Sequence, residues 1–345
     1  MNKKKIRELV MNAGIFAVIM GLTFWSVFRG QDIAEIVGAI GQMSGVYLAA
    51  SAFLAVFFVA GEGCMIWYLL RGIGERTTLP RCVSYSFIGF FFSGITPSAT
   101  GGQPMQLYFM KRDGNSLSAA SVVLMTVAVI YKLVLVLIGI GLLLFWGAPL
   151  RRYLQAYCGL YFLGLFLNVV LVVILLMVMF SQRTIRTCFY RIENVMVRFR
   201  LWKGSEKRRE KMEQFLSGYQ QTVLFLKSHR QLIGMTVAGT FLQRFSVFVM
   251  TYMVYRGLGL FGVAMADVVL VQAAVYIAVD MLPIPGAQGI TEAMYRSVFR
   301  DIFVGNYLVV SVCITRGISF YLMLLVGFLV FCVVRKKFVR IRQQF

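Results

Sequence analysis

Four ionisable side chains that lie within or beside apolar stretches are the residues of this chain best suited to chemistry. Glu62 and Lys132 each lie inside a long apolar run, whereas Asp280 and Glu292 flank a segment rich in glycine and proline. A charge in hydrocarbon is costly, so such residues mark a substrate or ion pathway by default. We therefore predict that Glu62, Asp280 and Glu292 contribute to a binding site.

Three basic residues lie in comparable apolar surroundings: Lys132, Arg244 and Arg316. Opposite charges can also pair inside a helical bundle and hold it together. For Lys132 and Arg244, a functional role and a structural ion pair are both open interpretations. We favour function for Glu292, because it opens the helix expected after the break, and we include Arg316 among the binding residues.

Two polar segments, at 92–104 and 280–292, break otherwise apolar sequence with glycine and proline. Non-helical backbone at membrane depth persists only where protein or a water-filled cavity satisfies its polar groups. The N-terminus of a half-helix has free N–H groups and partial positive charge, so it attracts anions such as phosphate. The predicted binding residues are Thr96, Ser98, Thr100, Gly101, Gly102 and Gln103 at the first break, and Gly286, Gln288, Gly289 and Thr291 at the second.

The sequence lacks the motifs of common enzyme classes. It has no Walker loop, no nucleophile elbow and no set of His and Cys at metal-ligand spacing, so no cofactor or metal is expected. The six cysteines are scattered and predict neither a disulfide framework nor a zinc site. The single histidine, His229, is expected at a helix end. Acyl or polyprenyl transfer by Asp or Glu with a metal is an alternative that no clustered acidic motif supports.

The composition is that of an integral membrane protein. Hydrophobic residues make up 59% of the 345 residues and charged residues only 14%, and mean hydropathy is +0.77. The net charge of +21 lies mostly in loops and tails, as the positive-inside rule requires, with any remainder available for anionic headgroups. Nucleic-acid binding is a poor interpretation, because the basic segments have no soluble domain around them. We expect one transmembrane domain over 1–345.

Six apolar runs are long enough to cross about 30 Å of hydrocarbon. They cover about 9–28, 46–70, 118–146, 157–181, 231–256 and 306–334. Basic clusters at both chain ends and in the loop 182–230 predict that all three are cytoplasmic. The same loop contains two amphipathic patterns at helical spacing, which fit either surface helices that sense lipid or plain connectors.

Counting spans between the basic clusters predicts that 83–110 enters and leaves from the cytoplasmic side and that 267–300 does so from the outside. The order of span, span, hairpin, span then occurs twice with opposite orientation. This is typical of an inverted repeat. The predicted fold is an all-α polytopic membrane protein with an inverted 4+4 repeat (about 1–150 and 151–345) and two re-entrant helical hairpins. A competing interpretation lets each hairpin cross the membrane fully.

At the two breaks the chain resembles a known family. Ile95-Thr96-Pro97-Ser98-Ala99-Thr100-Gly101-Gly102-Gln103-Pro104 and Leu282-Pro283-Ile284-Pro285-Gly286-Ala287-Gln288-Gly289-Ile290-Thr291-Glu292 are similar to the signature segments of the lysylphosphatidylglycerol synthase transmembrane-region family. This is the flippase-like region of the multiple peptide resistance factor proteins. The resemblance implies a multi-pass protein of the bacterial inner membrane that moves aminoacylated phosphatidylglycerol, with a link to envelope charge and resistance to cationic peptides.

The resemblance further implies that, in full-length resistance factors, a separate soluble domain makes this lipid. No such domain follows the last span here, so we expect binding or flipping of an anionic or aminoacylated phospholipid. The alternative is a phosphatidylglycerol lysyltransferase, or a membrane subunit acting with a separate synthase. Ala287-Gln288 departs from the commoner Pro-Gly-Gly-x-Gly form of the second segment, which bears on the headgroup.

Partners and roles follow from the same resemblance. The expected partners are the phospholipid, the membrane, a second copy in a homodimer, and a separate lipid synthase. Arg316 is expected to pair with the headgroup phosphate, and Glu62 or Glu292 with a cationic aminoacyl group.

Overall fold

The structure is a computed structural model that describes residues 43–96, 99–181, 206–282 and 290–343, with a few single residues outside these ranges. The predicted span 9–28 and the four residues of the first amphipathic pattern in the basic loop (Phe189, Ile192, Met196 and Phe199) lie outside the described residues. Four predicted site residues also lie outside them: Ser98, Gly286, Gln288 and Gly289.

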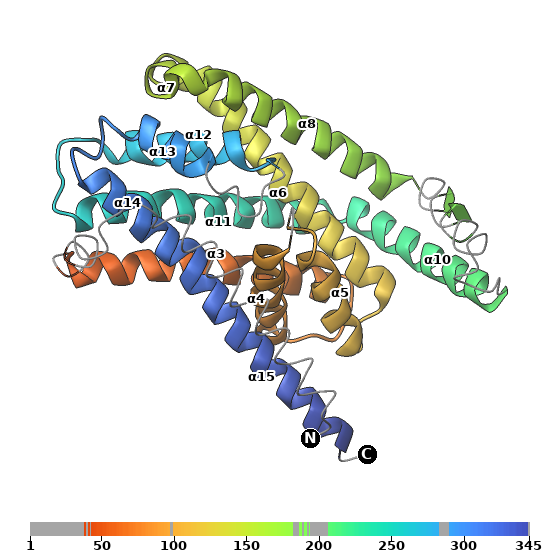
Figure 1. The fold of residues 1–345 in the computed structure, drawn as a ribbon. Coiled ribbons are helices and arrows are strands. Elements are labelled where there is room, and N and C mark those ends of the chain that lie inside the picture. Colours follow the sequence, from red (N-terminus) through yellow and green to blue (C-terminus); the bar gives the residue numbers. More distant parts are fainter. Residues whose placement is uncertain are drawn as a thin grey trace.

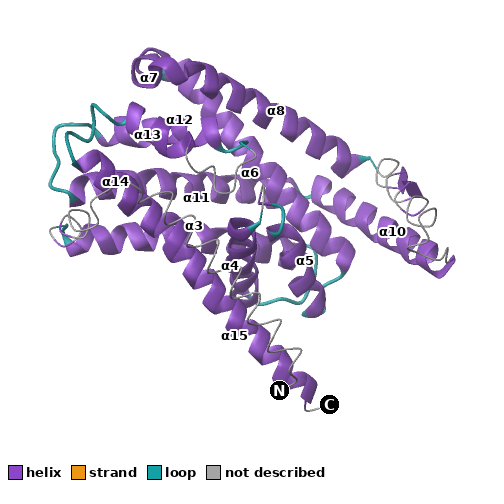
Figure 2. Ribbon diagram, in the orientation of Figure 1, coloured by secondary structure: helices purple, strands orange, loops and turns teal. Residues whose placement is uncertain are grey.

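The described chain is helical, with short loops and no strand in any described segment (Figures 1 and 2). In chain order the helices are α3 Gly45–Gly72, α4 Leu79–Ile95, α5 Gly102–Arg112, α6 Leu117–Phe145, α7 Gly147–Leu154, the 3-10 turn η2 Gln155–Tyr157, α8 Cys158–Phe180, α10 Glu206–Ser228, α11 Arg230–Gly257, α12 Met265–Val279, α13 Ile290–Val298, α14 Tyr307–Arg316, the π-helical turn η4 Gly317–Leu322, and α15 Met323–Gln343.

Five helical stretches of the described residues are long and apolar enough to cross a membrane. They are Gly45–Gly72, Leu117–Phe145, Gly147–Phe180, Arg230–Gly257 and Tyr307–Lys336. They coincide with the five predicted runs that fall in the described part of the chain. The third begins ten residues earlier than predicted, because α7 and η2 precede α8. The protein is therefore an all-α polytopic membrane protein.

Helices α3 and α11 lie side by side and antiparallel at the centre of the bundle (Figure 1). The amide of Ser44, just before α3, donates to the carbonyl of Gly257, the last residue of α11, at 3.3 Å. At the other end, Gly72 of α3 lies against Leu232 of α11. Each of these two long helices also packs against a shorter helix, α3 against α4 and α11 against α12.

The shorter helices form two pairs, α4 with α5 and α12 with α13. α4 packs against α3, α5 and α15, and α12 packs against α11, α8, α13 and α6. In the first pair, the hydroxyl of Tyr85, near the start of α4, donates to the carboxylate of Asp113, which follows the end of α5. Exchanging α3 with α11, α5 with α13 and α15 with α6 turns the three contacts of α4 into three of those of α12, and α12 packs on α8 in addition.

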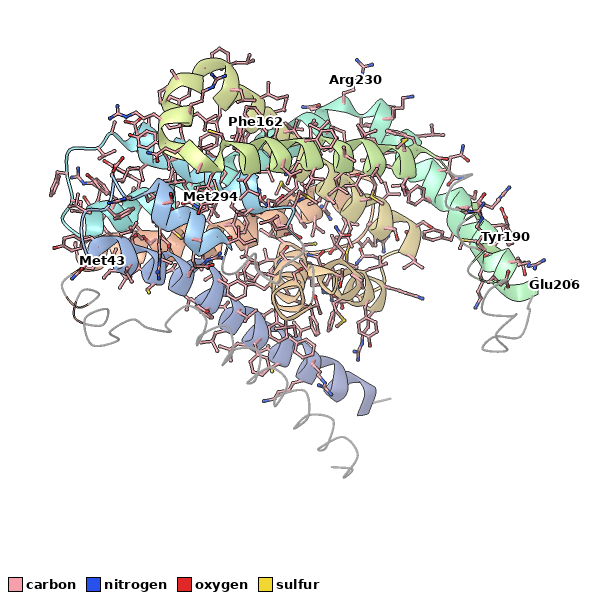
Figure 3. All side chains as sticks on the ribbon, turned by 45° about the horizontal axis from the view of Figure 1, so that its top comes forward. Met43, Phe162, Tyr190, Glu206, Arg230 and Met294 are labelled. Carbon is pink, nitrogen blue, oxygen red and sulfur yellow. The ribbon has the colours of Figure 1, made fainter. Side chains whose placement is uncertain are left out.

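Two helices extend from this core. α8 exposes a row of large apolar side chains, among them Phe162 (Figure 3), as expected for a helix that faces lipid. α10 confirms the second amphipathic pattern of the basic loop. Its buried face consists of Leu216, Tyr219, Val223 and Leu226. It packs on α6, where the Ser118 hydroxyl donates to the Phe215 carbonyl at 3.0 Å.

Candidate functional site

Glu62 lies in the middle part of α3, between two glycines that let neighbouring helices come close. A Cβ at Gly63 would lie 2.5 Å from the Cα of Val83, so α3 and α4 meet there through their backbones. A Cβ at Gly61 would lie 3.2 Å from Cγ of Gln243 on α11. Any larger side chain at Gly63 would force α4 away. The sequence Gly-Glu-Gly thus holds a carboxylate at a three-helix junction.

The Glu62 carboxylate accepts a hydrogen bond of 2.6 Å from Nε2 of Gln106 on α5. Gln106 is buried, and it passes over Gly89 of α4, where a Cβ would lie 2.4 Å from its Nε2 atom. Gln103, the predicted site residue one helical turn earlier, is exposed. Sequence reasoning missed Gln106. The available signal was a second glutamine three residues after the first, on a helix that follows the break.

Thr96 closes the turn between α4 and α5. Its hydroxyl donates to the carbonyl of Phe92 at 2.6 Å and accepts from the amide of Gly101 at 2.9 Å. The turn passes through Ala99 at φ 54°. Gly102, the first residue of α5, lies so close to α4 that a Cβ would meet the Ser93 hydroxyl at 2.1 Å. At the first break the backbone therefore forms a tight turn, and both hydrogen bonds of the Thr96 hydroxyl are made to the backbone of this turn.

Arg244 is a buried cation held by aromatic rings. Its guanidinium lies 3.5 Å from the ring centroid of Tyr131 on α6 and 4.6 Å from that of Phe58 on α3. Its Nη1 donates to the Tyr276 hydroxyl at 3.2 Å. The residue is 2% exposed, and its Nε has no hydrogen-bond partner among the described residues. Aromatic faces attract a cation but do not neutralise it.

Lys132 and Asp280 form an ion pair that links α6 to the end of α12. The Nζ to Oδ2 distance is 2.5 Å, and the two side chains are 16% and 8% exposed. The Tyr131 hydroxyl also donates to Asp280 at 3.1 Å and shares a 2.7 Å hydrogen bond with the Tyr276 hydroxyl. For Lys132 the structure thus favours the interpretation as an ion pair. Through the two tyrosines, Asp280 is connected to Arg244.

Glu292 and Arg316, both predicted site residues, form an ion pair with 2.8 Å between Oε1 and Nε. Glu292 lies in the first turn of α13, as predicted, and Arg316 ends α14. Directly after Arg316 the helix widens into the π-helical turn η4. The Ser319 hydroxyl donates to the Thr315 carbonyl at 2.6 Å in this region. Single π turns are frequent at functional sites.

The structure thus divides the predicted site residues into groups. It joins Glu292 to Arg316, places Asp280 in an ion pair, and pairs Glu62 with Gln106 instead of Gln103. Thr100 and Thr291 are both described, Thr100 in the first turn and Thr291 at the start of α13. No group of three or more His, Cys, Asp or Glu side chains that could hold a metal gathers within the described ranges.

The helices and the buried charges define a multi-pass membrane protein with polar groups at membrane depth. Its sequence matches the family described as the lysylphosphatidylglycerol synthase TM region over residues 12–327, and the chain belongs to this family. The resemblance inferred from the two break segments is confirmed. No curated protein matches the chain. Membership relates the protein to lysylphosphatidylglycerol synthesis or translocation.

Proposed function

We propose that this protein binds an anionic or aminoacylated phospholipid, such as lysylphosphatidylglycerol, and moves its headgroup across the membrane. The observation that supports this most is the set of charged and polar groups that lie between the helical pairs and the spans of a chain belonging to this family. A phospholipid headgroup that crosses hydrocarbon needs polar partners along its path. These groups would supply them.

An inverted repeat fits the packing. α3 and α11 are antiparallel, and the three contacts of α4 correspond to three of those of α12 when the two halves are exchanged. α4 and α5 have 17 and 11 residues, or about 26 and 17 Å at 1.5 Å per residue. α12 and α13, with 15 and 9 residues, are about 23 and 14 Å long. None of the four reaches ~30 Å, which favours re-entrant hairpins over full crossings.

In this proposal Arg316 binds the headgroup phosphate and Glu292 a cationic aminoacyl group. The two side chains now neutralise each other, and a zwitterionic headgroup offers the same pair of charges to both. A guanidinium is suited to phosphate because its planar donors can bind two oxygens at once. The free N–H groups of the half-helix that begins at Gly102 would add a second place for the phosphate.

The family description names a synthase, so a phosphatidylglycerol lysyltransferase, or a membrane subunit of one, is the second candidate. The flippase and the transferase differ in the substrates that they need. A flippase moves lipid that is already lysylated, whereas a transferase needs lysyl-tRNA and phosphatidylglycerol. We place the protein in the bacterial inner membrane with both termini in the cytoplasm, since the basic loop and the basic ends would then share one side.

The test is lipid movement in proteoliposomes. Purified protein is reconstituted with fluorescent lysylphosphatidylglycerol, phosphatidylglycerol or phosphatidylethanolamine, and a membrane-impermeant quencher reports the fraction of label that changes leaflet. We expect movement of the lysylated lipid by the wild type and a loss of at least tenfold in Arg316→Gln. Arg300→Gln is the matched control, because Arg300 is an exposed arginine just after α13.

Equal rates for empty and protein-containing vesicles with all three lipids would contradict the proposal. Formation of lysylphosphatidylglycerol from lysyl-tRNA by the purified protein would support the second candidate instead. Wild-type rates in Arg316→Gln would show that the Glu292–Arg316 pair is not part of the path.

A further inference from the structure

Glu62 stands apart from the other acidic residues of the described chain. It is the one Asp or Glu in the five membrane-crossing stretches. Its hydrogen bond comes from a neutral amide, and no cation of the described residues lies within 4.0 Å of its carboxylate. An ionised carboxylate at such depth without a paired charge is costly, and one route to lower that cost is to take up a proton.

The neighbours of Glu62 define what else could neutralise it. The elements packed against α3 carry the following titratable or charged groups near its middle or facing it: Cys82 and Tyr85 on α4, Tyr131 and Lys132 on α6, Arg244 on α11, Tyr321 on η4 with Arg316 just before it, and Cys332 on α15. α3 itself has Cys64, and α5 presents the neutral Gln106. Lys132 and Arg316 are already paired with Asp280 and Glu292.

Arg244 is the remaining cation near this level, and it lies on α11, which packs along α3. Its neighbour Gln243 contacts Gly61 and donates to the Phe58 carbonyl at 2.6 Å, one turn before Glu62. The guanidinium turns instead toward Tyr131 and Tyr276, which lead to Asp280. Glu62 and Arg244 are thus opposite charges on two adjacent helices, and they form no direct ion pair.

We propose that Glu62 takes up one proton and releases it in each cycle of lipid movement. Movement of the lipid in one direction is then coupled to movement of a proton in the opposite direction. The inference rests on the proposed function. At this level of the path, the Glu62 carboxylate binds either a proton or the cationic aminoacyl group, which Glu292 binds at its own place beside Arg316. The proton and the amine compete for the same oxygen atoms of Glu62. The proton comes from water on one side of the membrane and leaves to water on the other, with no change of oxidation state.

Gln106 and Arg244 have defined parts in this exchange. Gln106 orients the carboxylate by donating to Oε1, and it can do so whether Oε2 is protonated or not. Arg244, on the adjacent helix α11, is the cation that the Glu62 carboxylate would attract when it is ionised and binds no amine. When a proton or an amine neutralises Glu62, Arg244 would keep its contacts with Tyr131 and Tyr276.

The first measurement is infrared difference spectroscopy of the purified full chain as pH is lowered from about 8 to about 5. A carbonyl-stretch band of a protonated carboxylic acid should appear in the wild type, be absent in Glu62→Gln and shift in Glu62→Asp. Glu75→Gln is the matched control, because Glu75 lies in the loop after α3 and should leave the band unchanged. Gel filtration establishes that each variant is folded.

The second measurement is movement of fluorescent lysylphosphatidylglycerol in proteoliposomes with and without an imposed pH gradient. The gradient should change the wild-type rate at least fivefold and leave the rate of Glu62→Gln unaltered. Equal wild-type rates with and without the gradient, or a carboxylic acid band that persists in Glu62→Gln, would overturn the inference. No lipid movement by the wild type contradicts the proposed function instead, and the infrared band then decides whether Glu62 takes up a proton.

Discussion

Glu62 on α3 and Arg244 on α11 lie on two central helices that pack side by side, yet Glu62 binds the side-chain amide of Gln106 and Arg244 binds aromatic rings. Both charges stay inside the bundle without direct neutralisation by each other. A protein that only needed to hold its helices together would gain more from pairing these two charges, because a buried charge without a partner is costly. This arrangement is therefore better suited to binding.

The hydrogen bond between Gln106 and Glu62 gives a first prediction. Gln106→Leu should lower the free energy of unfolding by about 1.5–3 kcal/mol, because the bond is to a charged group at a buried position. Unfolding in mixed micelles with increasing denaturing detergent measures the loss. Gln103→Leu is the control, since Gln103 is exposed on the same helix, and it should change stability by no more than about 0.5 kcal/mol. Similar losses in both would contradict the assignment.

The contact of Gly63 with α4 gives a second prediction. Gly63→Leu forces a side chain into the backbone of Val83 and should destabilise the protein by about 1–3 kcal/mol or prevent its folding. The measurement is the temperature at which the detergent-solubilised protein loses its gel-filtration peak. Gly141→Leu on α6 is the matched control, because a Cβ there meets no atom within 4 Å. If both variants melt together, α3 and α4 are not in backbone contact.

The ion pair between Lys132 and Asp280 gives a third prediction. Lys132→Met or Asp280→Asn alone leaves a buried charge and should cost about 3–5 kcal/mol, whereas the double variant should recover much of that loss. A double-mutant cycle from unfolding curves measures the coupling. The pair of Arg186 and Glu213, with side chains 54% and 43% exposed, should couple by only about 0.2–1 kcal/mol. Additive effects at Lys132 and Asp280 would argue against a direct pair.

The turn closed by Thr96 gives a fourth prediction. Thr96→Val removes the hydroxyl that accepts from the Gly101 amide, so that amide should exchange its hydrogen at least fivefold faster. Hydrogen exchange read by mass spectrometry on peptides that cover the turn gives the rate. Thr96→Ser keeps the hydroxyl and should exchange like the wild type. An unchanged rate in Thr96→Val would mean that the turn does not depend on this bond.

The sequence by itself determined the class and the elements. Runs of apolar residues decide whether a segment can cross a membrane, and five predicted runs match the five spans of the described chain. The glycines, prolines and polar residues of 92–104 predicted the first break, and in the structure α4 ends at Ile95 and α5 begins at Gly102. The charged residues at membrane depth were also visible. These properties are local, so they can be read from neighbouring residues.

Only the tertiary structure decided which groups meet. Glu62 and Gln106 are 44 positions apart, and Lys132 and Asp280 are 148 apart. Such partners depend on how α3, α5, α6 and α12 cross, and that depends on close contacts such as Gly63 with Val83. Gln103 and Gln106 have the same side chain on the same helix, yet one is exposed and the other is buried. The rotation of α5 against α3 and α4 makes this difference, and no local pattern specifies it.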